Sequence, residues 1–107
     1  MIRLHYHTLA RNYRMGLRTL RRGTRWCHVY STEDLGELLR WGQRVGFPPS
    51  WIHNTAMPHF DAWGTMLRYC QAGPDQQVVD DRTFAEDLAA WRGRMATATP
   101  AGRPENG

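Results

Sequence analysis

The sequence predicts an α/β fold, in which a small single-layer sheet of about three to four strands has helices packed against it. Segments with the two-residue period of strands alternate along the chain with segments at helical spacing. The 107 residues, of which 41% are hydrophobic and 22% charged, suffice for one hydrophobic core but not for two. We therefore expect a single domain over residues 1–94 and a disordered tail over residues 95–107, which lack core-forming side chains.

The N-terminal part of the chain is expected to hold a strand and then a helix. Apolar and polar residues alternate over residues 2–7, which is the pattern of a half-buried strand. Over about residues 9–22 the apolar residues recur at helical spacing and the arginines fall on the opposite side, which predicts a basic amphipathic helix. Gly16 lies in the middle of this segment and disfavours the helix by about 1 kcal/mol relative to alanine.

Further strands and helices are expected in the rest of the chain. RWCHVY, residues 25–30, is short, β-branched and aromatic, which predicts a central strand. Ser31 and Asp34 resemble a capping box, and the leucine-rich helix after them is expected to end at Gly46. The remaining expected elements are a helix from Ala62 to the Gly73-Pro74 pair, a strand at QQVVDD and a helix after Thr83.

Positive charge gathers at the N-terminal end of the chain. Residues 1–25 hold seven arginines and no acidic residue, although the net charge of the whole chain is only +4. The chain has no lysine, which indicates the codon bias of a GC-rich bacterial genome. No stretch has the roughly 18 apolar residues of a membrane-spanning helix, and the N-terminus shows no secretory signal. We therefore expect a cytoplasmic protein with no membrane partner, in which Cys27 and Cys70 are reduced and buried.

The principal candidates for a functional site are His28, His59 and Asp61. His59 and Asp61 are two positions apart in the PHFD stretch, so their side chains can point to the same side of an extended chain. If the strand that carries His28 is central, His28 can meet them at the edge of the sheet. Two imidazoles and a carboxylate suit a divalent metal, zinc or manganese or iron, with a bound water. They equally suit metal-free acid/base catalysis.

These residues also have structural interpretations, which the sequence leaves open. Asp61 can cap a helix that begins at Ala62, and His59 can donate a hydrogen bond to a loop carbonyl. His5 and His7 share one face of the first strand and are further candidate metal ligands, although such pairs are commonly surface residues.

The strand at residues 25–30 presents different side chains on its two faces. Tyr30 lies on the same face as His28 and is a candidate catalytic group, either as a general acid or as a hydroxyl that supports the site. Cys27 faces the opposite side and is expected in the core.

Residues 26–73 carry a series of motifs in a fixed order, which are Cys27-His28 on a hydrophobic strand, the leucine-rich helix ending at Gly46, Trp51, and His59-Phe60-Asp61. This order resembles domain-of-unknown-function family 4031, a family of bacterial and phage proteins. Where that family has an acidic N-terminal strand, this chain has Leu4-His5-Tyr6-His7, so a function of that acid would be missing here or would have passed to imidazole. The resemblance implies the α/β fold and a site at His28, His59 and Asp61, and it implies no particular reaction.

The arginines support a functional hypothesis of another class. Guanidinium groups along one helix can neutralise phosphates, and such binding weakens with salt. The residues concerned are Arg11, Arg14, Arg18 and Arg22. The two alternatives are an enzyme with hydrolytic or acid/base chemistry on a small anionic substrate, and a non-catalytic module that binds nucleic acid or an acidic protein. Trp41 lies off the apolar stripe of its helix, so an exposed Trp41 would indicate a contact surface, such as that of a homodimer.

Overall fold

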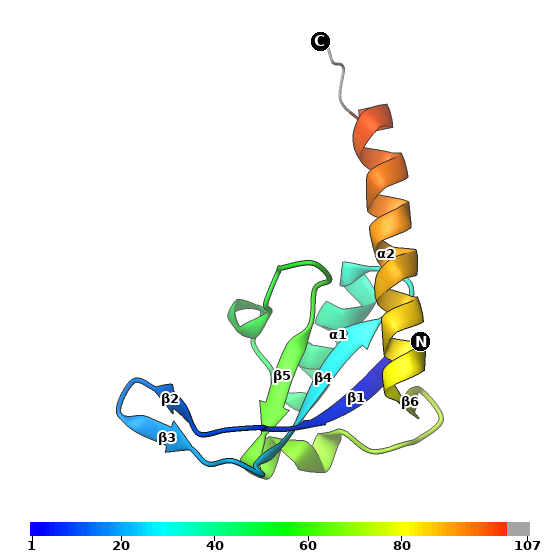
Figure 1. The fold of residues 1–107 in the computed structure, drawn as a ribbon. Helices are drawn as coiled ribbons and strands as arrows, with labels where there is room; N and C mark the ends of the chain where they lie inside the picture. Colours follow the sequence, from blue (N-terminus) through cyan, green and yellow to red (C-terminus); the bar gives the residue numbers. More distant parts are fainter. Residues whose placement is uncertain (103–107) are drawn as a thin grey trace.

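The structure is a computed structural model and describes residues 1–102. Its centre is a four-stranded sheet with the order β5-β4-β1-β6, in which β1 and β6 run parallel and the other neighbours antiparallel. Figure 1 shows that the β2–β3 hairpin projects from one end of this sheet. The predicted α/β class is confirmed. The elements are β1 (Ile2–Thr8), β2 (Tyr13–Met15), β3 (Arg18–Leu20), β4 (Arg25–Ser31), α1 (Leu35–Val45), η1 (Pro49–Trp51), β5 (Phe60–Trp63), η2 (Gly64–Tyr69), β6 (Gln76–Val79) and α2 (Asp81–Gly102).

One face of the sheet is apolar and packs against α1. Alternation along β1, β4 and β5 turns every second side chain to this face, as the sequence predicts for β1 and β4. Cys27 and Cys70 are both buried here as free thiols, which confirms their prediction. The core consists of Ile2, Leu4, Cys27, Val29, Leu38, Trp41, Phe47, Phe60, Ala62 and Cys70.

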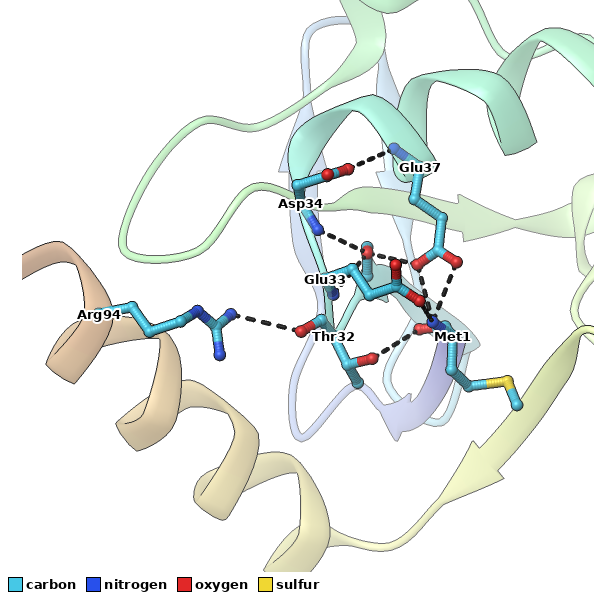
Figure 2. A network of polar contacts seen from close by, with 7 residues as sticks. Met1, Thr32, Glu33, Asp34, Glu37 and Arg94 are labelled. Atoms are coloured by element: carbon cyan, nitrogen blue, oxygen red, sulfur yellow. Dashed lines mark hydrogen bonds and ion pairs between the residues drawn. The ribbon is translucent and has the colours of Figure 1, made fainter. Parts of the chain in front are cut away.

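Helix α1 begins and ends at well-defined caps. Asp34 is the N-cap and accepts a hydrogen bond of 2.8 Å from the backbone N–H of Glu37 (Figure 2). The carboxylate of Glu37 in turn accepts from the α-ammonium of Met1 at 2.9 Å and from the hydroxyl of Ser31 at 2.5 Å. The predicted helix is confirmed, but its cap lies at Asp34 and not at Ser31. Gly46 ends the helix with a left-handed φ of 94°.

The other face of the sheet is polar and carries α2. Figure 1 shows this helix rising from the end of β6 and extending beyond the sheet. Arg3 donates two hydrogen bonds of 2.9 and 2.8 Å to Asp87 of α2, and the hydroxyl of Tyr30 donates a third of 2.5 Å. Arg94 donates to the carbonyl of Thr32 at 3.4 Å (Figure 2). These bonds hold α2 against the polar face. None of the described helices is both long and apolar enough to cross a membrane.

The predicted basic helix over residues 9–22 is wrong, because this segment forms the β2–β3 hairpin. Gly16 has a φ of 59° and occupies the first position of the two-residue turn with Leu17, as type II′ hairpin turns require. The long-range pairing of β1 with β4 brings Thr8 opposite Arg25, so the residues between them must reverse direction. Leu17, which the predicted helix would have placed on its apolar stripe, is fully exposed at the hairpin tip.

The prediction that Asp61 caps a helix at Ala62 is also wrong. The chain passes through Asp61 as strand β5, and the following helical turn begins only at Gly64. Pairing of β5 with β4 outweighs the local helical pattern, and it turns Asp61 to the polar face opposite His28.

A further prediction differs from the structure, and one conditional prediction is decided by it. Helix α2 continues to Gly102, so residues 95–102 of the predicted tail are helical. Residues 103–107 lie outside the described part of the chain. Trp41 is fully buried and donates from Nε1 to the side chain of Gln76 at 2.6 Å, so it forms no contact surface.

Candidate functional site

All five histidines of the chain form one cluster on the polar side of the sheet. His5 and His7 lie on β1, and His28 on β4 is the cross-strand partner of His5. His53 and His59 pair through two backbone hydrogen bonds of 2.8 and 3.1 Å just before β5. Neighbouring ring centroids are 4.2 Å apart for His5 and His7, 4.4 Å for His7 and His28, 4.7 Å for His28 and His59, and 5.4 Å for His59 and His53. We call this set the histidine cluster.

Asp61 is the carboxylate at the centre of one half of the cluster. Its Oδ1 lies 2.8 Å from Nδ1 of His28 and 3.4 Å from Nε2 of His59, and its Oδ2 lies 3.3 Å from Nε2 of His53. Burial alone would raise the pKa of Asp61, but the hydrogen bond from His28 and the neighbouring imidazoles outweigh it and lower the pKa. Asp61 is therefore an anion that three imidazoles surround.

Hydrogen bonds set which nitrogen of each imidazole carries the proton. The Nδ1 of His59 lies 2.8 Å from the carbonyl oxygen of Met57, which can only accept, so Nδ1–H donates and Nε2 keeps its lone pair. This loop-carbonyl bond was one of the expectations for His59, and it is confirmed. Burial lowers the pKa of His59, which favours the neutral ring. By the same reasoning Nδ1–H of His28 donates to Asp61, so the lone pair of His28 is on Nε2.

The other half of the cluster is formed by His5 and His7. His5 is 2% exposed, and its Nε2 lies 2.7 Å from Oδ1 of Asp81 at the start of α2. The ring of Phe84 stacks on His5 at 4.2 Å, and the indole of Trp26 stacks on His7 at 4.8 Å. Burial, together with the positive charges that His28 and His5 can carry, lowers the pKa of His7 from 6.5 to about 4.

The cluster contains two groups of side chains that could hold a metal ion. In each group the three available ligand atoms lie within 4.8 Å of one another. Tetrahedral zinc with bonds of about 2.1 Å holds its ligands about 3.4 Å apart. The wider separations, of up to 4.8 Å, would therefore have to shorten, and the 2.8 Å between Nδ1 of His28 and Oδ1 of Asp61 would have to lengthen. We call the group of His28, His59 and Asp61 the Asp61 site, and the group of His5, His7 and His28 the His7 site.

A pocket of about 910 Å³ opens beside the cluster, along the edge strand β5. Asp61 and His53 are among its lining residues, so the pocket adjoins the Asp61 site. Arg18 reaches its wall from the β2–β3 hairpin. The lining further includes two tryptophans and three hydroxyl-bearing residues, which are Trp51, Trp63, Thr24, Ser50 and Thr65.

The structure brings together most of the residues that the sequence predicts for a site. His28, His59 and Asp61 converge, and His5 and His7 join His28. Tyr30 lies on the face of His28, as expected, but it is fully buried and its hydroxyl donates to Asp87. Its place is therefore between the sheet and α2, away from the pocket.

Sequence reasoning missed four side chains of the site and the position of the arginines. Of these, only His53 could have been found from the sequence. His53 and His59 flank a five-residue loop, and a loop of that length can close as a hairpin that brings the two histidines together. Asp81, Phe84 and Trp26 could not be found, because their place depends on the strand order and on where α2 lies. The arginines predicted on a helix are instead exposed on or beside the β2–β3 hairpin, and they are Arg11, Arg14, Arg18 and Arg22.

Comparisons of the chain with protein-family models, with curated proteins and with solved structures gave no match. The resemblance to domain-of-unknown-function family 4031 therefore stays a prediction.

Proposed function

We propose that the protein is a metal-dependent hydrolase that acts on a small anionic substrate, with the metal at the Asp61 site. The observation that carries this proposal is the convergence of His28, His59 and Asp61 to within 4.8 Å beside a pocket. Imidazole nitrogen and carboxylate oxygen are ligands of zinc, and the same set of two histidines and one carboxylate also suits manganese or iron.

Three protein ligands leave a coordination position for water, and a divalent metal lowers the pKa of such a water to about 7. A bound ion would take the place of the proton on Nδ1 of His28, which would pass to solvent, whereas the bond to Met57 already leaves Nε2 of His59 available as a ligand. His53 is 55% exposed, lines the pocket and lies 3.3 Å from Asp61, so it is placed to move a proton between the site and solvent.

The pocket lining supports an anionic substrate with a flat or apolar part. Arg18 supplies a guanidinium, which suits carboxylate or phosphate oxygens. The indoles of Trp51 and Trp63 offer apolar surface for the remainder of the molecule.

Metal content is the first test. The protein, purified without a histidine tag, is expected to retain close to one equivalent of a divalent metal at the Asp61 site, and His59→Ala should lose it. Saturation with metal at 100 times its dissociation constant stabilises a fold by about 2.7 kcal/mol, which raises the melting temperature of a domain of this size by roughly 10–20 °C. If neither metal content nor a chelator changes the melt, the metal-dependent reaction is wrong, and the His28–Asp61 pair remains as an acid/base pair.

Hydrolysis is tested with chromogenic phosphate and carboxylate esters. Asp61→Asn should abolish turnover without unfolding the protein, and Arg18→Gln should raise KM for anionic esters with little change for neutral ones. Arg44→Gln is the matched control, because Arg44 is an exposed arginine in the last turn of α1. Equal effects of Arg18→Gln and Arg44→Gln would contradict a role of Arg18 in substrate binding.

A second candidate function, nucleic-acid binding, is supported by the β2–β3 hairpin. The hairpin projects from the body of the molecule (Figure 1), and its Tyr13 is 56% exposed and its Leu17 fully exposed. Exposed guanidiniums beside exposed apolar side chains suit phosphates and bases of a single strand. Replacing Arg11, Arg14, Arg18 and Arg22 by alanine should then weaken oligonucleotide binding and flatten its dependence on salt. Binding that is insensitive to salt would contradict this function.

A further inference from the structure

The His7 site has features that the proposed reaction does not use. His5 and His28 are directly opposite each other on β1 and β4, and His7 lies two residues further along the same face of β1. One ring nitrogen from each of the three histidines lies within 4.8 Å of the other two. The strand register alone therefore holds three imidazoles in a group, with no loop involved.

Two nitrogens in this group are buried without a hydrogen-bond partner among the described residues. They are Nδ1 of His5 and Nε2 of His7. Buried polar atoms normally have a partner, and an orphaned one needs an explanation. Since Nε2 of His5 donates to Asp81, Nδ1 of His5 carries a lone pair inside a side chain that is 2% exposed. A buried lone pair that faces other imidazoles is what a metal ligand provides.

The carboxylates around the group orient its imidazoles as they do in metal sites. Asp81 accepts from Nε2 of His5, and Asp61 accepts from Nδ1 of His28 as long as the Asp61 site holds no ion. Such carboxylate–histidine pairs fix the ring and the tautomer and make the other nitrogen a better ligand. Phe84 on His5 and Trp26 on His7 enclose the rings in aromatic surface, which limits access of water.

We infer that His5, His7 and His28 form a second metal site, which takes Zn²⁺ or another divalent metal that prefers imidazole nitrogen. Three histidines leave a fourth position open, as in catalytic zinc sites. His28 belongs to both sites. With its Nδ1 directed at Asp61, its Nε2 is the nitrogen that would be left for a site with His5 and His7. This inference does not depend on the reaction proposed for the Asp61 site.

The test counts bound metal. The untagged protein is stripped with a chelator, dialysed against Zn²⁺ and analysed for zinc per chain. We expect two equivalents for the unchanged protein, one for His7→Gln, one for His59→Gln and none for His28→Gln. His53→Gln is the matched control, since His53 belongs to neither group, and it should keep both ions.

The same set of variants separates the two proposals. If the unchanged protein binds one equivalent that His7→Gln abolishes and His59→Gln keeps, the His7 site stands and the Asp61 site is wrong. If one equivalent is lost in His59→Gln and kept in His7→Gln, the inference about the His7 site is overturned. Zinc content that none of these substitutions changes overturns it as well.

A substitution outside the buried group can test the His7 site in a protein that still folds. The side chain of Asp81 is 95% exposed, so Asp81→Asn should leave the fold intact by circular dichroism and melting. Because Asp81 orients His5, we expect Asp81→Asn to weaken Zn²⁺ at the His7 site by about 10–100-fold and to leave the Asp61 site unchanged. Unaltered affinity at both sites would contradict the proposed role of Asp81.

Discussion

The hydrogen bonds at Asp87 are expected to decide whether α2 stays on the polar face of the sheet. Tyr30 is fully buried there, and Asp87 and Arg3 are only 18% and 25% exposed, so these bonds are partly shielded from water. The perturbations that test this are Tyr30→Phe, which removes one donor, and Asp87→Asn, which removes the charge that both donors share. The first change leaves no new buried polar atom on the sheet, whereas the second leaves the guanidinium of Arg3 without its counter-charge.

The size of the effect follows from the three hydrogen bonds. A hydrogen bond to a charged group contributes about 1.5–3 kcal/mol, and in Tyr30→Phe two bonds from Arg3 to Asp87 remain. We therefore expect Tyr30→Phe to lower the free energy of unfolding by about 2 kcal/mol, which is roughly 8–16 °C in melting temperature for a domain of this size. Asp87→Asn should lower it by at least as much. The double variant should fall short of the sum by about 1 kcal/mol, because the two residues share one interaction.

Urea unfolding of the two single variants and the double variant gives these free energies, and limited proteolysis reports whether α2 has become accessible. Tyr13→Phe is the control, since Tyr13 is 56% exposed and its hydroxyl should contribute less than about 0.5 kcal/mol. A Tyr30→Phe variant as stable as that control, or strictly additive single variants, would refute the role of Asp87. A strong loss of activity in a fully stable Tyr30→Phe variant would instead support the predicted catalytic role of Tyr30.

Two other properties of the fold can be measured. Gly42→Ala should destabilise the protein by about 1–3 kcal/mol, because the added Cβ would lie 2.8 Å from the ring of Phe60 and 2.9 Å from the carbonyl oxygen of Phe47. Thermal melts measure this loss. The control in the same melts is Gly93→Ala, because a Cβ at Gly93 would meet no atom within 4 Å. In metal-free buffer, stability should fall as the pH falls from about 6.5 to about 4, because the folded state lowers the pKa of His7 and the unfolded chain therefore binds the proton more tightly. If the whole pKa shift of His7 contributed, the free energy of unfolding would change by about 3 kcal/mol. Because His7 is partly exposed to solvent, we expect a change on the order of 1 kcal/mol. Urea midpoints at several pH values give the slope, and a slope that His7→Gln leaves unchanged would contradict this assignment.

The elements that the sequence predicts well are those in which local and long-range preferences agree. β1 and β4 alternate with a two-residue period, and the sheet buries the side that the alternation makes apolar. Helix α1 has an acidic cap, an apolar stripe and a terminal glycine, and each of these acts locally. The meeting of His28 with His59 and Asp61 could be anticipated because a central strand needs a neighbour on each side, and the segment that carries Asp61 supplies one of them.

The predictions that failed are those in which long-range pairing outweighs a local pattern. The helical periodicity of residues 9–22 is real, but Gly16 and the pairing of β1 with β4 convert this segment into a hairpin. The local sequence around Asp61 suits the start of a helix, but pairing with β4 makes this segment strand β5. In both cases the deciding partner is a strand elsewhere in the chain, and the order of strands in the sheet cannot be read from periodicity.

The polar face of the sheet is less favourable for stability than an apolar face would be. His5, His7 and Trp26 each leave a buried nitrogen without a hydrogen-bond partner among the described residues, and each such group is unfavourable by about 1–3 kcal/mol. Apolar side chains at these positions would pack under α2 without that penalty. A metal that uses the nitrogens of His5 and His7 would remove most of it, so binding at the His7 site and folding should be strongly coupled. The metal-free protein is then expected to open first at α2, because this helix covers the same unsatisfied groups through Phe84.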